Sequence, residues 1–246
     1  MSTFLTAFRY ELKAFFAVPL GYLYLAVFTF LSVFLAFTVG EFFTLDDSGL
    51  SASFFTWHPL VHALLAPALG MRSWSQEKSQ GTLELLRAQP IDLRALLLGK
   101  YIAAVAIVLT ALLLTFPLVV TVFSLGTPDL GELLCGYLGS LLLATAFLAL
   151  ATWLSALLDS PVTVYLSATA VCLSFVLMGS PQFAGELLNV FPGSKVLVDG
   201  LASLGVMAPF DQFRQGVITG FGLIYFGTLI LGGLLLTHFA LKITLD

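Results

Sequence analysis

The chain contains 246 residues, of which 59% are hydrophobic and only 10% are charged, and its mean hydropathy is +1.02. An ordinary soluble domain carries about 25% charged residues, so this composition excludes a soluble globular protein. The formal net charge of −4 does not identify a partner, because orientation in a membrane depends on where Lys and Arg lie. Nucleic acid is not expected among the partners.

Six apolar stretches, each longer than 20 residues, contain no Asp, Glu, Lys or Arg. A helix needs about 20 apolar residues to cross the hydrocarbon core, and in lipid it satisfies its own backbone hydrogen bonds. We therefore predict an all-α membrane protein, a single transmembrane domain with six transmembrane helices. The predicted spans are residues 19–40, 54–71, 100–124, 133–157, 161–180 and 215–241.

The basic residues are distributed unevenly over the segments between the spans. If the N-terminus is cytoplasmic, eight of the ten Lys and Arg residues lie on the cytoplasmic side, and only Lys195 and Arg214 lie outside. This asymmetry follows the positive-inside rule and predicts that both termini are cytoplasmic. The eight inner residues are Arg9, Lys13, Arg72, Lys78, Arg87, Arg94, Lys100 and Lys242.

Two segments outside the spans show apolar residues at helical spacing. Residues 2–17 place Phe4, Phe8 and Leu12 on one face, with charged residues largely opposite. This pattern predicts an amphipathic helix in the inner membrane interface. The outer connection, residues 181–214, is too apolar for an open polar loop. It predicts two short helices that dip into the outer leaflet or cap the bundle.

The most informative connection is the inner loop at residues 72–99. It contains Gly81-Thr82-Leu83-Glu84-Leu85-Leu86, then Pro90, and then Asp92 in position to cap the helix that leads into the third span. The leucines and their charged neighbours indicate a compact helix presented to the cytosol. From these residues alone, a solvated amphipathic linker and a docking helix fit the pattern equally well.

The inner loop resembles that of a known transporter family. Glu77, the Gly81-to-Leu86 segment, Pro90 and Leu98-Gly99-Lys100 together resemble the permease subunits of ABC-2 type transporters. The six spans, the N-terminal helix and the long outer connection resemble that family too, so the likeness covers the whole chain. Pro209-Phe210-Asp211-Gln212-Phe213, followed by Gly216-Val217-Ile218, is similar to the gliding-motility-type and copper-enzyme-maturation-type permeases.

The resemblance implies that the inner loop is a coupling helix that docks on a separate ABC ATPase subunit. ATP hydrolysis there would drive substrate export or mechanical transmission across a bacterial inner (plasma) membrane. The residues that would form the contact are Glu77, Gly81, Thr82, Leu83, Glu84, Leu85 and Leu86. Further implied partners are a second permease copy or a related permease, membrane lipid, and an accessory protein with a periplasmic domain. No cofactor is expected in this chain, because ATP and Mg would be bound by the partner ATPase.

Catalytic and metal-binding patterns are weak in this sequence. Gly99-Lys100 is followed by Tyr101 where a phosphate-binding loop needs Ser or Thr, and no catalytic motif is present, so we do not expect an enzyme. His58 and His62 have metal-ligand spacing, but Pro59 follows His58 and no nearby acid or Cys completes a site. Hydrogen bonding by two neutral histidines at the outer interface is therefore favoured over metal binding.

The charge-free stretches also bear on the energy source. Ion-coupled transporters usually place a charged side chain inside the bundle, so energy supplied from the cytosolic side fits this chain better. The alternative function is a non-transporting membrane scaffold or anchor that recruits periplasmic or cytosolic partners. An intramembrane enzyme is disfavoured because its catalytic residues are missing.

Overall fold

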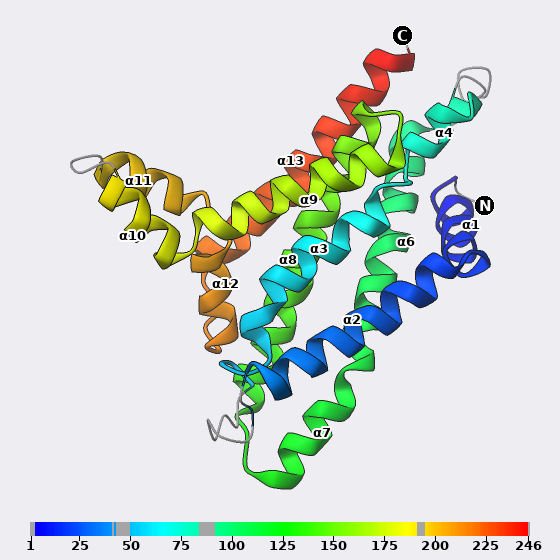
Figure 1. The fold of residues 1–246 in the computed structure, drawn as a ribbon. Helices are drawn as coiled ribbons and strands as arrows, with labels where there is room; N and C mark the ends of the chain where they lie inside the picture. Colours follow the sequence, from blue (N-terminus) through cyan, green and yellow to red (C-terminus); the bar gives the residue numbers. More distant parts are fainter. Residues whose placement is uncertain (1–2, 41, 43–49, 84–91, 191–194, 246) are drawn as a thin grey trace.

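The computed structural model describes residues 3–40, 42, 50–83, 92–190 and 195–245, and every regular element in these residues is a helix (Figure 1). The predicted all-α fold is therefore confirmed. The elements are α1 (Thr3–Ala17), α2 (Pro19–Thr38), a short 3-10 helix η1 (Phe55–Trp57), α3 (His58–Gly70), α4 (Ser75–Ser79), α6 (Leu93–Leu114), α7 (Phe116–Leu125), α8 (Leu130–Leu157), α9 (Pro161–Met178), α10 (Pro181–Val190), α11 (Lys195–Ser203), α12 (Met207–Arg214) and α13 (Gly220–Leu245).

Five helical segments are long and apolar enough to cross a membrane, which shows a multi-pass membrane protein. They are Pro19–Thr38, Leu93–Leu125, Leu130–Leu157, Pro161–Met178 and Gly220–Thr244. The predicted span at 54–71 is shorter than these, because only η1 and the 13 residues of α3 are helical there. The third span starts earlier than predicted, at Leu93. There the Asp92 carboxylate accepts a hydrogen bond from the Arg94 backbone N–H at 3.0 Å, as expected of a cap.

Helix α8 lies at the centre of the bundle and packs against α3, α6, α9, α12 and α13. Small residues let the neighbouring backbones approach it closely. A methyl group added at Gly70 of α3 would lie 2.7 Å from the Cβ of Ala151, and one added at Gly233 of α13 would lie 2.9 Å from the Ala149 backbone. Both distances are too short, so these contacts require glycine.

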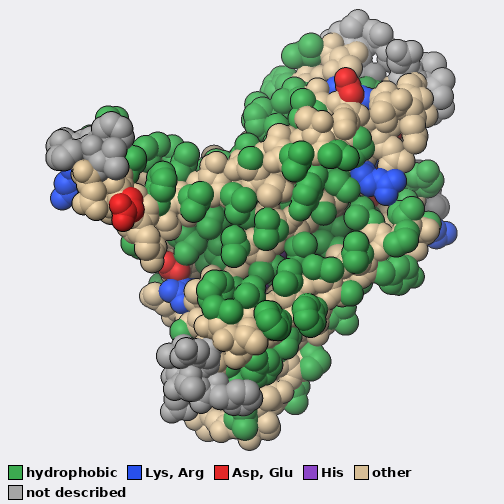
Figure 2. All heavy atoms as spheres, in the orientation of Figure 1, with side chains coloured by type: hydrophobic (Ala, Val, Ile, Leu, Met, Phe, Trp, Pro, Cys, Tyr) green, Lys and Arg blue, Asp and Glu red, His purple; other side chains and the backbone are tan. Residues whose placement is uncertain are grey.

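Polar contacts mark the two ends of the bundle, while hydrophobic side chains cover the middle of the face seen in Figure 2. At one end, the Arg214 guanidinium donates to the Ser51 carbonyl and the Thr56 hydroxyl, each at 3.0 Å. At the other end, the Lys78 ammonium lies 3.7 Å from the Asp159 carboxylate. Helix α3 therefore begins beside Arg214 and ends close to the segment that contains Lys78.

The outer connection contains three helices rather than the predicted two. Helices α10 and α11 pack on each other and on α9, and they project away from the bundle (Figure 1). Helix α12 instead packs on α8 and buries Phe210 and Phe213. The difference arises because Phe210 and Phe213, three residues apart, form an apolar face that fits the small residue Gly139 of α8.

The close contact between α3 and α8 gives a stability test. We expect Gly70→Leu to lower the stability of the detergent-purified protein by about 1–3 kcal/mol, because overpacking forces the two helices apart. The measurement is the apparent midpoint of thermal unfolding. Gly227→Leu is the matched control, since a Cβ at that α13 position meets nothing within 4 Å. Equal midpoints for the two variants would contradict the packing described above.

Candidate functional site

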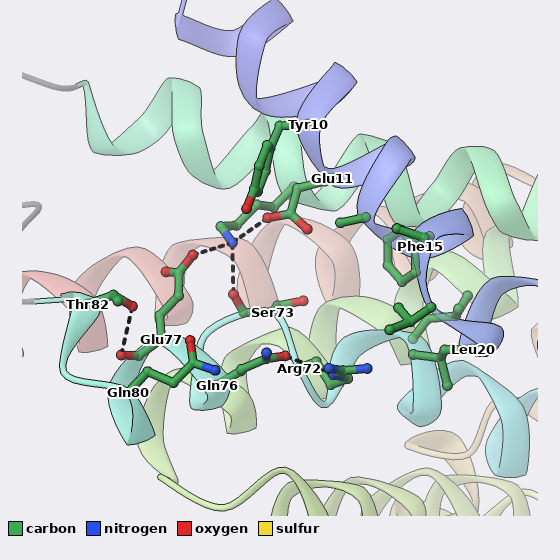
Figure 3. Close-up of a pocket in the computed structure, with 15 residues that line it drawn as sticks. Tyr10, Glu11, Phe15, Leu20, Arg72, Ser73, Gln76, Glu77, Gln80 and Thr82 are labelled. Carbon is green, nitrogen blue, oxygen red and sulfur yellow. Dashed lines mark hydrogen bonds and ion pairs between the residues drawn. The ribbon is translucent and has the colours of Figure 1, made fainter.

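The candidate site is built around the ammonium group of Lys100, near the start of α6. Among the described residues, Lys100 is the one charged side chain that is buried, with 6% of it exposed. Its ammonium donates to the Glu11 carboxylate at 2.5 Å, the Glu77 carboxylate at 2.7 Å and the Ser73 carbonyl at 3.1 Å. All three of its N–H groups thus have acceptors. Figure 3 shows Glu11 and Glu77 approaching the same nitrogen from two sides.

Three separate segments contribute these groups. Glu11 lies on α1, Ser73 and Glu77 lie in the segment that follows α3, and Lys100 lies on α6. Helix α1 is held against α6 at Gly99, where an added methyl group would lie 2.7 Å from the Cβ of Ala7. The cluster therefore joins the N-terminal helix, the inner loop and the candidate span Leu93–Leu125 at one point.

The electrostatic balance of the cluster is uneven. One positive charge faces two carboxylates, whose side chains are 19% and 27% exposed. The ammonium also lies 5.0 Å from the centre of the Trp74 ring, a favourable position for a cation. One oxygen of Glu77, Oε2, is buried and has no hydrogen-bond partner among the described residues. The cluster thus keeps a surplus of negative charge and one free acceptor.

A cavity of about 500 Å³ opens beside the cluster. Its walls come from α1, the start of α2, the end of α3 and the segment from Arg72 to Thr82 (Figure 3). Charged and amide groups line one part of it, and apolar side chains such as Phe15 and Leu20 line another. This arrangement can bind an amphiphilic molecule.

The structure describes four of the seven predicted coupling residues. Gly81 and Thr82 are exposed at the tip that follows α4, and Gly81 has a φ of +67°, a conformation that favours glycine. Glu77 points into the Lys100 cluster. Leu83 is 5% exposed and packs with Trp74 and other buried residues of this chain. The remaining predicted residues lie outside the described residues; they are Glu84, Leu85 and Leu86.

The two histidines lie in the bundle interior and share one partner. His58 Nδ1 and His62 Nε2 lie 2.6 Å and 2.8 Å from the Ser140 hydroxyl of α8, and both rings are fully buried. The hydrogen bonding agrees with the role favoured above, but the predicted position at the outer interface is wrong, because both rings are fully buried against α8. In the parts of the chain that the structure describes, no group of three or more His, Cys, Asp or Glu side chains gathers in a geometry for metal binding.

Comparison with known proteins now gives the family. A family model described as ABC-2 family transporter protein matches residues 51–243, more than three quarters of the chain. The chain belongs to the ABC-2 transporter family. A search of curated proteins returns no match. The matched region starts after α2, so this ABC-2 protein has two N-terminal helices outside the match, including α1 with Glu11.

The sequence marks Lys100 as a basic residue at the edge of a span and as part of the Leu98-Gly99-Lys100 motif, but it does not mark Lys100 as the centre of a site. The sequence nevertheless contains a signal for the acidic partners of Lys100. Lys100 immediately precedes an apolar stretch, and Glu11 and Glu77 both fall on the side where the positive-inside rule places it. A buried ammonium group requires acidic partners. The segments that contain Glu11 and Glu77 can each supply one to Lys100, which is buried in α6.

Removing the cation of this ABC-2 protein tests the cluster. We expect Lys100→Met to lower the free energy of unfolding by about 2 kcal/mol, because two carboxylates then face each other without compensation. The measurement is thermal unfolding of the purified protein. Adding Glu11→Gln and Glu77→Gln to this variant should restore much of the stability, since no uncompensated charge remains. A Lys100→Met protein as stable as the parent would contradict the ion cluster.

Proposed function

We propose that this chain is the membrane-spanning permease subunit of an ATP-driven ABC-2 transporter in a bacterial inner membrane. A separate ABC ATPase, which membership of this family implies as a partner, would bind ATP and Mg; this chain would transmit the resulting movement and would not itself be an enzyme. The family match over residues 51–243 is the observation on which the proposal depends. The outcome would be export of a substrate or mechanical transmission across the membrane.

The proposal includes six membrane crossings. Five are the candidate spans given above, and α3, which follows α2 in the chain, is the additional crossing. Helices η1 and α3 together form an uninterrupted helical run from Phe55 to Gly70, about 24 Å long at 1.5 Å per residue. Helix α3 packs against α2, α8 and α9, so protein surrounds much of this short helix. It also extends from the end of the bundle near Arg214 to the end near Lys100. An even number of crossings puts both termini on the same side, and the positive-inside rule makes that side the cytoplasm.

Coupling to the ATPase is proposed at the inner loop, with a division of roles among its residues. Gly81 and Thr82 are exposed and would contact the ATPase, as would Glu84, Leu85 and Leu86 on the strength of the sequence resemblance. Leu83 is buried in this chain and would anchor the loop beneath the bundle. Glu77 would transmit movement, because its carboxylate holds the ammonium of α6 at 2.7 Å.

The cluster makes a rigid-body movement plausible in physical terms. A push on the inner loop reaches α6 through Glu77 and Lys100, and it reaches α1 through Lys100 and Glu11. Helix α1 would lie in the inner interface, with Tyr10 exposed and Ala7 against α6. Movement of packed helices as units is a common type of conformational switch. A second permease, homologous or identical, and an accessory protein with a periplasmic domain complete the proposed assembly.

The number of crossings can be tested by labelling single cysteines with an impermeant thiol reagent in intact spheroplasts, in a chain whose two native cysteines are replaced by Ser. Thr6→Cys, Thr244→Cys and Ser203→Cys each place a thiol at an exposed position. We expect Ser203→Cys to react, and the other two to react only after the membrane is permeabilised. Reaction of Thr244→Cys but not Thr6→Cys in intact spheroplasts would mean an odd number of crossings.

The coupling contact can be tested by co-purification with the ATPase. We expect Gly81→Trp to abolish co-purification, because a bulky side chain at the exposed tip blocks docking and the φ of +67° strains any residue with a Cβ. Gly200→Trp is the matched control: it lies on α11, and a Cβ there also meets nothing within 4 Å. Glu84→Arg should weaken the contact without preventing membrane insertion. Retention of the ATPase by both Gly81→Trp and Glu84→Arg would refute the coupling assignment.

A further inference from the structure

We propose that the cavity between α1 and the segment from Arg72 to Thr82 binds the headgroup of a zwitterionic phospholipid that carries a primary ammonium, as phosphatidylethanolamine does. This inference goes beyond the proposed transport function and shares with it only the placement of α1 at the inner membrane interface. The binding groups are a free carboxylate oxygen for the ammonium, a guanidinium for the phosphate and an apolar wall for the upper acyl chain.

The cavity has the size and position that such a ligand needs. Its volume is about 500 Å³, within the range of sites that bind small molecules. It lies at the junction of α1 and α2, where the chain turns from the N-terminal helix into the first candidate span. A lipid headgroup of the inner leaflet lies at this same depth, so the ligand could enter from the side.

The acceptor for the ammonium is Glu77. Its Oε1 bonds Lys100, while its Oε2 is buried without a partner among the described residues. Leaving a buried carboxylate oxygen without a donor is unfavourable. Lys100 cannot supply a further bond, because its three N–H groups already reach Glu11, Glu77 and Ser73. Oε2 is covered in this structure, so a cation in the cavity would satisfy this oxygen once the carboxylate turns toward it, and the cation would also balance the surplus negative charge.

The donor for the phosphate is Arg72, which is half-buried at the cavity wall. Its Nε donates to Gln76 Oε1 at 2.8 Å, which fixes the guanidinium plane. The other four N–H groups of Arg72 bond no acceptor in the described part of the chain, and a guanidinium fork fits a phosphate well. Figure 3 shows Arg72 and Glu77 on the same segment, with Gln76 between them in the sequence.

The apolar wall completes the match. Phe15, Val18 and Leu20 from the α1–α2 junction and Leu69 from α3 line the cavity. A free phosphoethanolamine would leave this wall in contact with water, whereas an acyl chain would cover it. A choline headgroup has no N–H to donate to Glu77, and a glycerol headgroup has no cation. The chemistry therefore selects a lipid with a primary ammonium.

The test is native mass spectrometry of the purified protein in micelles doped with defined lipids. Phosphatidylethanolamine should remain bound about tenfold more than phosphatidylcholine or phosphatidylglycerol, the difference expected for one lost charge-assisted hydrogen bond. Free phosphoethanolamine at the same concentration should not bind. Equal retention of the three lipids would overturn the proposal, and binding of the free headgroup would overturn its lipid source.

Variants then locate the site. Ala14→Trp should fill the cavity and remove the preference, while Thr6→Trp, at an exposed position outside the cavity on the same helix, should keep it. Arg72→Gln should reduce retention by about tenfold, and Arg9→Gln, an exposed arginine of α1, should not. An unchanged preference in both Ala14→Trp and Arg72→Gln would overturn the site. The measurement needs no ATPase, so its failure and the failure of the coupling assignment are distinguishable.

Discussion

The inner end of this bundle depends on one buried ammonium group. Burial of Lys100 would be unfavourable without partners, and its partners come from two segments that lie 89 and 23 residues away in the sequence. Satisfying its three N–H groups requires α1, the segment after α3 and α6 to meet at one place. The close approach of α1 at Gly99 supports the same geometry, because a larger residue there would separate the helices.

The middle of the bundle follows a different physical rule. Its helices have few polar groups to orient them, so they are held by shape, and the small residues of α8 allow its neighbours to pack closely. Some polar groups pair across helices, as the Ser140 hydroxyl shows by meeting both buried histidines. Others, such as the buried Ser32 hydroxyl, have no hydrogen-bond partner among the described residues. A bundle held by shape in the middle and by charges at its ends would move as packed units, as the proposed coupling requires.

The sequence predicts the helices of this fold better than it predicts the contacts between them. Five of the six predicted spans correspond to long apolar helices, because a long charge-free stretch is a local property. The segment at 54–71 gives a shorter α-helix, since a turn and the 3-10 helix η1 precede the start of α3 at His58. For Lys100, the sequence indicated the side of the membrane on which its acidic partners lie but not which acids they are. The partner of the histidines was not predictable, because spacing along one helix carries no information about a residue about 80 positions away. The burial of Leu83 was missed for the same reason.

The charge count at Lys100 connects the coupling proposal to the lipid proposal. Two carboxylates share one ammonium, so the contact between α1 and the inner loop carries one more negative charge than Lys100 balances. A ligand that supplies a cation only when these segments are together would favour that arrangement by mass action. The lipid would then set the resting position of the loop on which the ATPase acts. Because α1 lies outside the family-matched region while Arg72 and Glu77 lie inside it, this control would depend on both parts of the chain.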